Sequence, residues 1–257
     1  MQRALLLNGC IFLLLLGWSL LPSVYRGWTI LPLWIACTAL IFTGSFEAAR
    51  LRRRVWLDQY LLPASPWHRL LRGGVLMGVW HVLTGSLLSL FMLFKMQTLS
   101  AALWALLVAG VPLIAVLMRG LQARLRVHVL PDVLPALVRR FAVPLAVSLL
   151  TVLYLIVTLS QGHADLRGMS WGAVMAEHLQ PSPAPFAGML FLDRLYLMQD
   201  LTLHWALQNG LGGTERSGGL ALVGWSLLLL SGGAFILAYV RLMIGADALF
   251  SLRREAI

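Results

Sequence analysis

Two ionisable side chains lie where chemistry within a membrane would need them. His81 is the one histidine of six that falls inside a long apolar block, and Glu47 stands at the end of another. Ionisable residues at membrane depth are costly and often functional. A lone histidine equally suits a hydrogen bond that joins two packed helices. Two interpretations stay open: an intramembrane enzyme that acts through His81 or Glu47, and a helix-packing role.

The other motifs favour no metal, haem or nucleotide site. A haem between helices usually needs two facing histidines at membrane depth, and one is present. Cys10 and Cys37 fall within apolar blocks and form no Cys-x-x-Cys pair. No Gly-x-x-x-x-Gly-Lys-Ser/Thr phosphate loop occurs. We therefore expect no cofactor and no metal, and we favour a role that is not enzymatic.

The composition is that of a membrane protein. Hydrophobic residues make up 60% of the chain and charged residues 12%, whereas soluble domains have about 45–50% and about 25%. A net charge of +10 would suggest nucleic acid as the partner of a soluble domain. Here the basic residues flank apolar blocks, which is the topology signal of a membrane protein. We expect the lipid bilayer, and no nucleic acid, as partner.

Six apolar blocks are long enough to cross a bilayer core of about 30 Å, which takes about 20 helical residues. The predicted fold is therefore an all-α, polytopic membrane helix bundle with about six transmembrane helices in a single domain, residues 1–257. The expected spans are residues 4–21, 28–48, 73–94, 98–118, 141–160 and 219–245. The first block resembles a signal peptide, but Pro22-Ser23-Val24 is a poor cleavage site, so we expect a retained helix.

The basic residues are distributed unequally between the two sides of these spans. Fourteen fall at the N-terminus, the loops after the second and fourth spans and the C-terminus, and five fall on the opposite side. The last one, Arg241, is near the inner end of the sixth span. Because cytoplasmic loops are enriched in Lys and Arg, we expect both chain ends in the cytoplasm of a bacterial cell, with the chain in the inner membrane.

The longest outer loop, residues 161–218, is expected to contain a helix of its own. Residues Met189–Leu207 place Asp193, Asp200 and His204 at helical spacing, with leucines elsewhere around the helix. This pattern is moderately amphipathic, as in a helix that lies at the membrane interface or re-enters the membrane.

The loop over residues 50–72 is the main cytoplasmic feature. Its middle, Arg53–Leu62, predicts a short basic amphipathic helix that ends at Pro63. The sequence from Phe46-Glu47 through Leu57-Asp58-Gln59-Tyr60-Leu61-Leu62-Pro63-Ala64-Ser65 to Gly73 resembles permease subunits of type-2 ABC exporters. It departs from that family in having Arg52-Arg53-Arg54 where a Gly-Thr step is usual.

The resemblance implies a function for this loop. In that family the helix after the second span is the coupling helix, which docks on a separate ATP-binding subunit, so Val55–Leu62 would take that role here. The residues that the resemblance assigns to ATPase coupling are Glu47, Val55, Trp56, Asp58, Gln59, Tyr60, Leu61, Leu62 and Pro63.

Two further hypotheses follow for the whole chain. The first is the permease subunit of an ATP-driven exporter, which forms homo- or hetero-oligomers with other membrane subunits and binds a cytoplasmic ATPase. The alternative is a non-catalytic structural subunit of a larger secretion or conjugation assembly, since low charge and many small residues suit packing between helices.

Overall fold

The computed structural model contains eight helices in the part of the chain that it describes, and the protein is all-α. The described residues are 2–60, 65, 74–130, 133–162, 164–179, 187–210 and 217–255. The helices are α1 (Gln2–Ser19), α2 (Ser23–Tyr60), α4 (Val75–Met96), α5 (Ala101–Leu125), α6 (Leu134–Leu159), α7 (Trp171–His178), α8 (Ala187–Gly210) and α9 (Ser217–Glu255).

Five helical segments are long and apolar enough to cross a membrane, so the chain is a multi-pass membrane protein. They are Val24–Arg50, Val75–Met96, Ala101–Leu125, Leu134–Leu159 and Gly219–Ala248. They match the second to sixth predicted spans. The first predicted span, residues 4–21, is the apolar helix α1, which is shorter than the other five.

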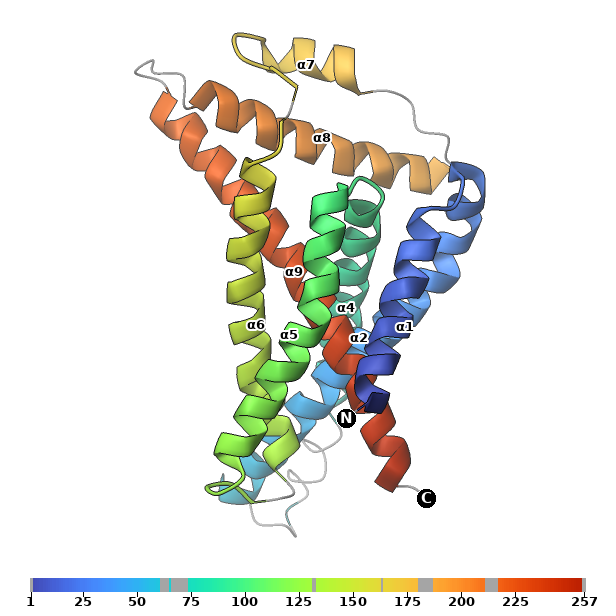
Figure 1. The fold of residues 1–257 in the computed structure, drawn as a ribbon, viewed down its shortest axis with the longest axis vertical. Coiled ribbons are helices and arrows are strands. Elements are labelled where there is room, and N and C mark those ends of the chain that lie inside the picture. The colour runs from blue at the N-terminus through green and yellow to red at the C-terminus, as the bar shows by residue number, and fades with distance from the viewer. Residues whose placement is uncertain are drawn as a thin grey trace.

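The two ends of the helix bundle differ in structure (Figure 1). The N-terminus, the C-terminus, the end of α2 and the connection from α5 to α6 all lie at the lower end. Helix α8 lies across the upper end, and α7 lies outside it. The helix predicted over residues 189–207 is therefore present, and it covers one end of the bundle.

Helix α2 continues well past its membrane segment, which ends at Arg50. Residues 48–60 contain alanine, leucine and arginine, which favour helix, and neither glycine nor proline. The separate short helix predicted from Arg53 is therefore wrong for the described residues: those up to Tyr60 are the last turns of α2.

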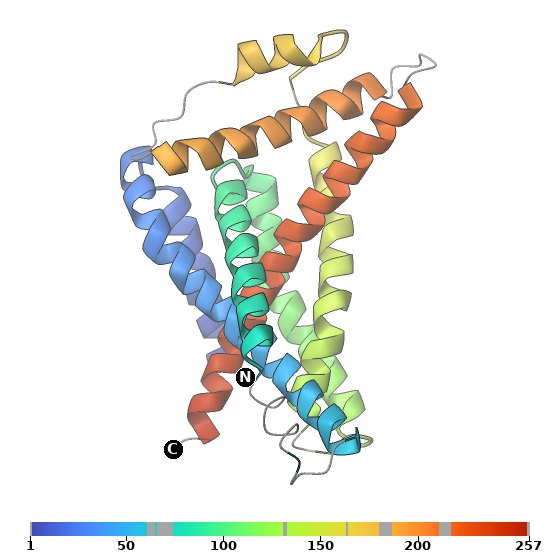
Figure 2. The ribbon, with the colours of Figure 1, turned by 180° about the vertical axis from the view of Figure 1, so that it is seen from behind.

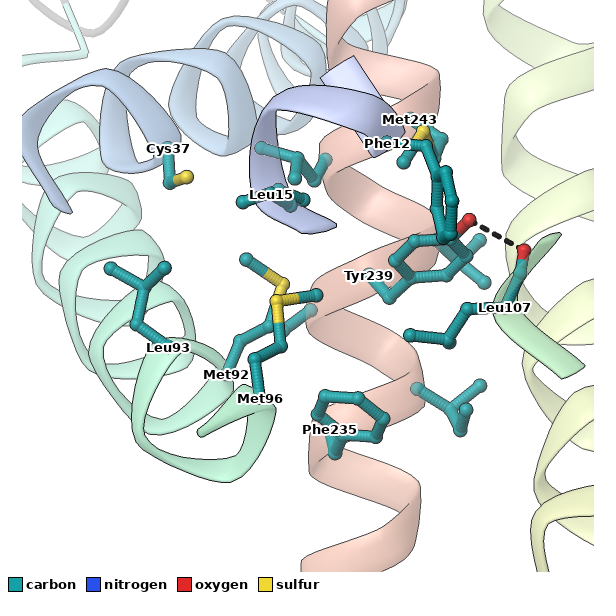
Figure 3. Packing of buried hydrophobic residues seen from close by; sticks show 14 of the residues in the cluster. Phe12, Leu15, Cys37, Met92, Leu93, Met96, Leu107, Phe235, Tyr239 and Met243 are labelled. Carbon is teal, nitrogen blue, oxygen red and sulfur yellow. Dashed lines mark hydrogen bonds between the residues drawn. The ribbon is translucent and has the colours of Figure 1, made fainter. Parts of the chain in front are cut away.

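Helix α9 is the centre of the core. Phe235, Tyr239 and Met243 are fully buried and lie next to Phe12 of α1 and Met92 of α4 (Figure 3). The Tyr239 hydroxyl donates a hydrogen bond of 2.8 Å to the backbone carbonyl of Leu107 in α5, which satisfies a buried polar group. Residues 235–246 of α9 are buried nearly all round, as expected of a helix enclosed by others.

Helices α2 and α9 cross as an X, with α6 to one side (Figure 2). At the crossing, a Cβ atom added to Gly44 would lie 2.8 Å from Cα of Gly245, and one added to Gly245 would collide with the carbonyl of Leu40. The two backbones can touch because both residues are glycine, a packing that is common between membrane helices.

Candidate functional site

A cavity of about 800 Å³ lies between α2, α6 and α9, which cross near one another, and α4 adds one lining residue. Helix α2 contributes Gly44, Ala48 and Arg52 to its lining. The wall opposite comes from α6, and α9 contributes residues between Leu237 and Ile244. Ligand-binding cavities in proteins commonly measure about 300–1,000 Å³, so this cavity can hold a small molecule or a substantial part of a larger one.

The lining is apolar with a strong positive charge. The described residues that line it include no aspartate and no glutamate, but they include four arginines: Arg52, Arg139, Arg140 and Arg241. They come from three helices that are distant in sequence. Arg139 is buried and Arg241 is half-buried, whereas Arg52 and Arg140 are exposed and partly screened by solvent.

Glu47 compensates one of these charges. Its Oε2 accepts a hydrogen bond of 2.7 Å from Nη1 of Arg139, whose side chain is buried. The pair joins α2 to α6 beside the cavity. Glu47 was predicted from the family resemblance to take part in ATPase coupling, and the structure places it in a helix-to-helix ion pair.

His81 lines the same cavity from α4. Its Nδ1 atom is buried and has no hydrogen-bond partner among the described residues. The ring lies 6.4 Å from the ring of Phe46 in an edge-on arrangement. The expected hydrogen bond between helices is therefore not formed through Nδ1, and His81 and Arg241, singled out separately in the sequence, face one cavity.

A second polar cluster lies at the opposite end of the bundle. The amino group of Lys95, at the end of α4, lies 2.9 Å from Oδ1 of Asp200 in α8. The same amino group lies 5.7 Å from the centre of the Tyr196 ring. Nδ1 of His204 is 3.7 Å from Oδ2 of Asp200. A partly buried ion pair thus fastens α8 to the bundle.

Tyr196 completes this cluster. Its hydroxyl shares a hydrogen bond of 3.1 Å with that of Thr98, and burial raises the pKa of Tyr196 to about 12. The phenol is therefore neutral at physiological pH. Asp193, which the sequence placed on the same face as Asp200, lies two turns earlier and is half-buried.

The predicted ATPase-coupling residues are described in part. Gln59 lines the cavity, and the Tyr60 side chain is 70% exposed. Val55, Trp56 and Asp58 belong to α2, but their side chains are outside the described part of the structure. Leu61, Leu62 and Pro63 lie outside the described residues.

The sequence analysis did not single out two basic residues, one at the cavity and one in the cluster around Asp200. Arg139 was counted as a loop residue that indicates topology, yet it is buried within α6. Lys95 was one of the five basic residues counted on the outer side, between the third and fourth expected spans. Lys95 is the only lysine of the chain and lies at the end of an apolar block. These two facts were the signal in the sequence that could have identified it.

Among the described residues, no three histidine, cysteine, aspartate or glutamate side chains are grouped to hold a metal ion. Comparisons of the chain with protein-family models, with curated proteins and with solved structures found no match.

Proposed function

We propose that this chain is the membrane-spanning permease subunit of an ATP-driven exporter of the type-2 ABC kind, coupled to a separate cytoplasmic ATPase through the 50–72 loop. The observation that carries the proposal is the continuity of α2. One helix extends from the membrane segment to Tyr60, and it contributes cavity-lining residues from Gly44 to Gln59.

This continuity gives a physical route for coupling. An unbroken helix moves as a unit, because its backbone hydrogen bonds resist local bending. A partner that displaced the end of α2 near Tyr60 would therefore also displace the cavity wall at Ala48 and Arg52. Movements of this kind, in which packed helices shift by small angles, are common in switching proteins.

The proposal includes the location of the chain. The arginine-rich segments lie at the end of the bundle that holds both termini. By the positive-inside rule, that end faces the cytoplasm of a bacterial inner membrane. The end of α2, where the Tyr60 side chain is exposed, would then be accessible to a cytoplasmic ATPase.

The test is affinity purification of the tagged full-length protein from its native host in a mild detergent, with mass spectrometry of the proteins that co-purify. We expect a stoichiometric ATP-binding subunit that is lost when Tyr60 and Leu61 are both changed to Asp. The matched control is Gly172→Asp at the other end of the bundle, where a Cβ would meet no atom within 4 Å. This variant should keep the partner.

Two results would contradict the proposal. Co-purification of several membrane or periplasmic proteins without an ATPase would support the structural-subunit alternative. A protein that purifies alone would leave His81 and Glu47 as candidates for intramembrane chemistry.

A further inference from the structure

The charge of the cavity between α2, α4, α6 and α9 is only partly balanced by protein. Arg139 is paired with Glu47. Within the described residues, no carboxylate forms an ion pair with Arg52, Arg140 or Arg241. About three positive charges therefore face a cavity that contains no acidic side chain among its described lining residues.

The rest of the cavity wall is mostly apolar, with Ser45, Gln59 and Ser148 as its polar residues besides His81. Val143 and Val147 of α6 lie on one side, and Leu237 and Ile244 of α9 lie on the other. A ligand that complements this cavity needs an anionic group for the arginines and a hydrocarbon part for these side chains, since a small hydrated anion would leave the apolar wall without contacts.

The basic side chains themselves suggest which anion. The four cationic residues that line the cavity are all arginine, and the planar guanidinium fork donates paired hydrogen bonds to phosphate. His81 of α4 also lines the cavity, but its Nδ1 atom is buried from solvent and is not presented to a ligand there. Arginines of three helices, α2, α6 and α9, thus line one cavity with groups that bind phosphate oxygens.

The depth of the cavity also suits a lipid. His81 lies six residues into α4 from Val75, which is about 9 Å along the helix. The headgroup position is therefore within the edge of the apolar layer, at the end of the bundle that holds the arginine-rich segments. Basic pockets between transmembrane helices on that side of a membrane bind the headgroups of anionic lipids.

We propose that this cavity is a binding site for an anionic amphiphile, in which a phosphate-bearing headgroup contacts Arg52, Arg140 and Arg241 while an acyl or isoprenoid tail packs along α6 and α9. The proposal rests on the cavity and holds whether or not an ATPase binds α2.

Native mass spectrometry of the purified full-length protein in a neutral detergent tests this site. The protein is titrated with dioleoylphosphatidylglycerol, with dioleoylphosphatidylcholine, which has the same tails but no net charge, and with inorganic phosphate. We expect a 1:1 adduct with phosphatidylglycerol at lower lipid concentration than with phosphatidylcholine. Inorganic phosphate should not displace the lipid.

Substitutions locate the site. Arg52→Gln and Arg241→Gln should each weaken phosphatidylglycerol binding about fivefold, as expected for one cationic side chain near an anionic lipid. Arg241→Lys, which keeps the charge but loses the paired hydrogen bonds, should weaken binding less than Arg241→Gln. Arg124→Gln is the matched control, because Arg124 is exposed at the same end of the bundle and does not line the cavity.

A variant that leaves the charge unchanged tests the tail. Val147→Trp should fill the space beside the apolar wall and weaken lipid binding, while the protein still elutes as a single species.

The proposal is overturned by equal binding of the two lipids, by an equal effect of Arg124→Gln and Arg241→Gln, or by displacement of the lipid by inorganic phosphate. The last result would identify a soluble phosphate compound as the ligand.

Discussion

Lys95 Nζ lies 2.9 Å from Oδ1 of Asp200, so the only lysine of the chain holds the transverse helix α8 against the end of α4. The Lys95 side chain is 11% exposed and that of Asp200 is 27% exposed. In such surroundings each charge depends on the other, because removal of one partner leaves the second poorly solvated.

Lys95→Met should therefore lower stability by roughly 2–3 kcal/mol, somewhat less than for a fully buried pair, because Asp200 keeps some contact with solvent. The double change Lys95→Met with Asp200→Leu should recover part of the loss. The measurement is the temperature at which half of the detergent-solubilised protein loses its monodisperse elution peak.

Arg194→Met, at an exposed position of α8, is the control and should change this temperature little. A double variant that is less stable than Lys95→Met would contradict this account.

The segment before α7 is held to α8 by hydrogen bonds from side chains to the backbone. Gln208 accepts one of 2.6 Å from the amide of Leu166, and Asn209 accepts one of 2.9 Å from the amide of Gly168. Gln208→Ala and Asn209→Ala should each raise hydrogen–deuterium exchange at the affected amide about fivefold, the effect of losing a bond of about 1 kcal/mol. Mass spectrometry of peptides that cover residues 164–178 measures this. Gln122→Ala on α5 should leave these peptides unchanged, and unaltered exchange in both variants would show that these bonds do not hold the segment.

The crossing of α2 and α9 should not tolerate a larger side chain at Gly44 or Gly245. Gly245→Val places a side chain against the Leu40 carbonyl, and Gly44→Val places one against the backbone of α9. Each should cost at least the 1–3 kcal/mol typical of an overpacked core and remove the monodisperse elution peak. Gly233→Val is the matched control in α9, because a Cβ there meets no atom within 4 Å. Normal assembly of Gly245→Val would refute close contact of the two backbones.

The orientation of the bundle can be tested with single cysteines. In a background with Cys10→Ser and Cys37→Ala, a cysteine at Gly172 should react with a membrane-impermeant maleimide in intact cells whose outer membrane is permeabilised. A cysteine at His128 should react only after the inner membrane is disrupted. Both positions are exposed and lie at opposite ends of the bundle. The reverse pattern would place the termini outside the cytoplasm.

The sequence predicted those features that depend on local composition. Apolar blocks of sufficient length located the five long spans and α1, since burial in lipid demands such blocks. The end of α2 was predicted wrongly because the arginines after Arg50 suggested a boundary, whereas arginine is a good helix former and does not end a helix.

The candidate site depends on contacts between distant segments, which composition does not specify. His81 and Arg241 were noted as polar residues in membrane segments, but that they share a cavity with Arg52 follows from how α2, α4 and α9 pack. In the same way, the spacing of Asp200 and His204 predicted an amphipathic helix. The lysine that the helix would meet was not evident until α8 was placed across the end of α4.

The glycine contact between α2 and α9 is a point about which the two helices can rotate. Gly44 and Gly245 form this pivot, and residues of both helices on one side of it line the cavity. Arg52 is about 12 Å from the pivot along α2 and Gln59 about 22 Å, at 1.5 Å per residue. A change of about 10° in the crossing angle would move Arg52 by about 2 Å and Gln59 by about 4 Å, while Gly44 stayed in place. A change in the crossing angle would thus widen or narrow the cavity while the contact between Gly44 and Gly245 stays in place.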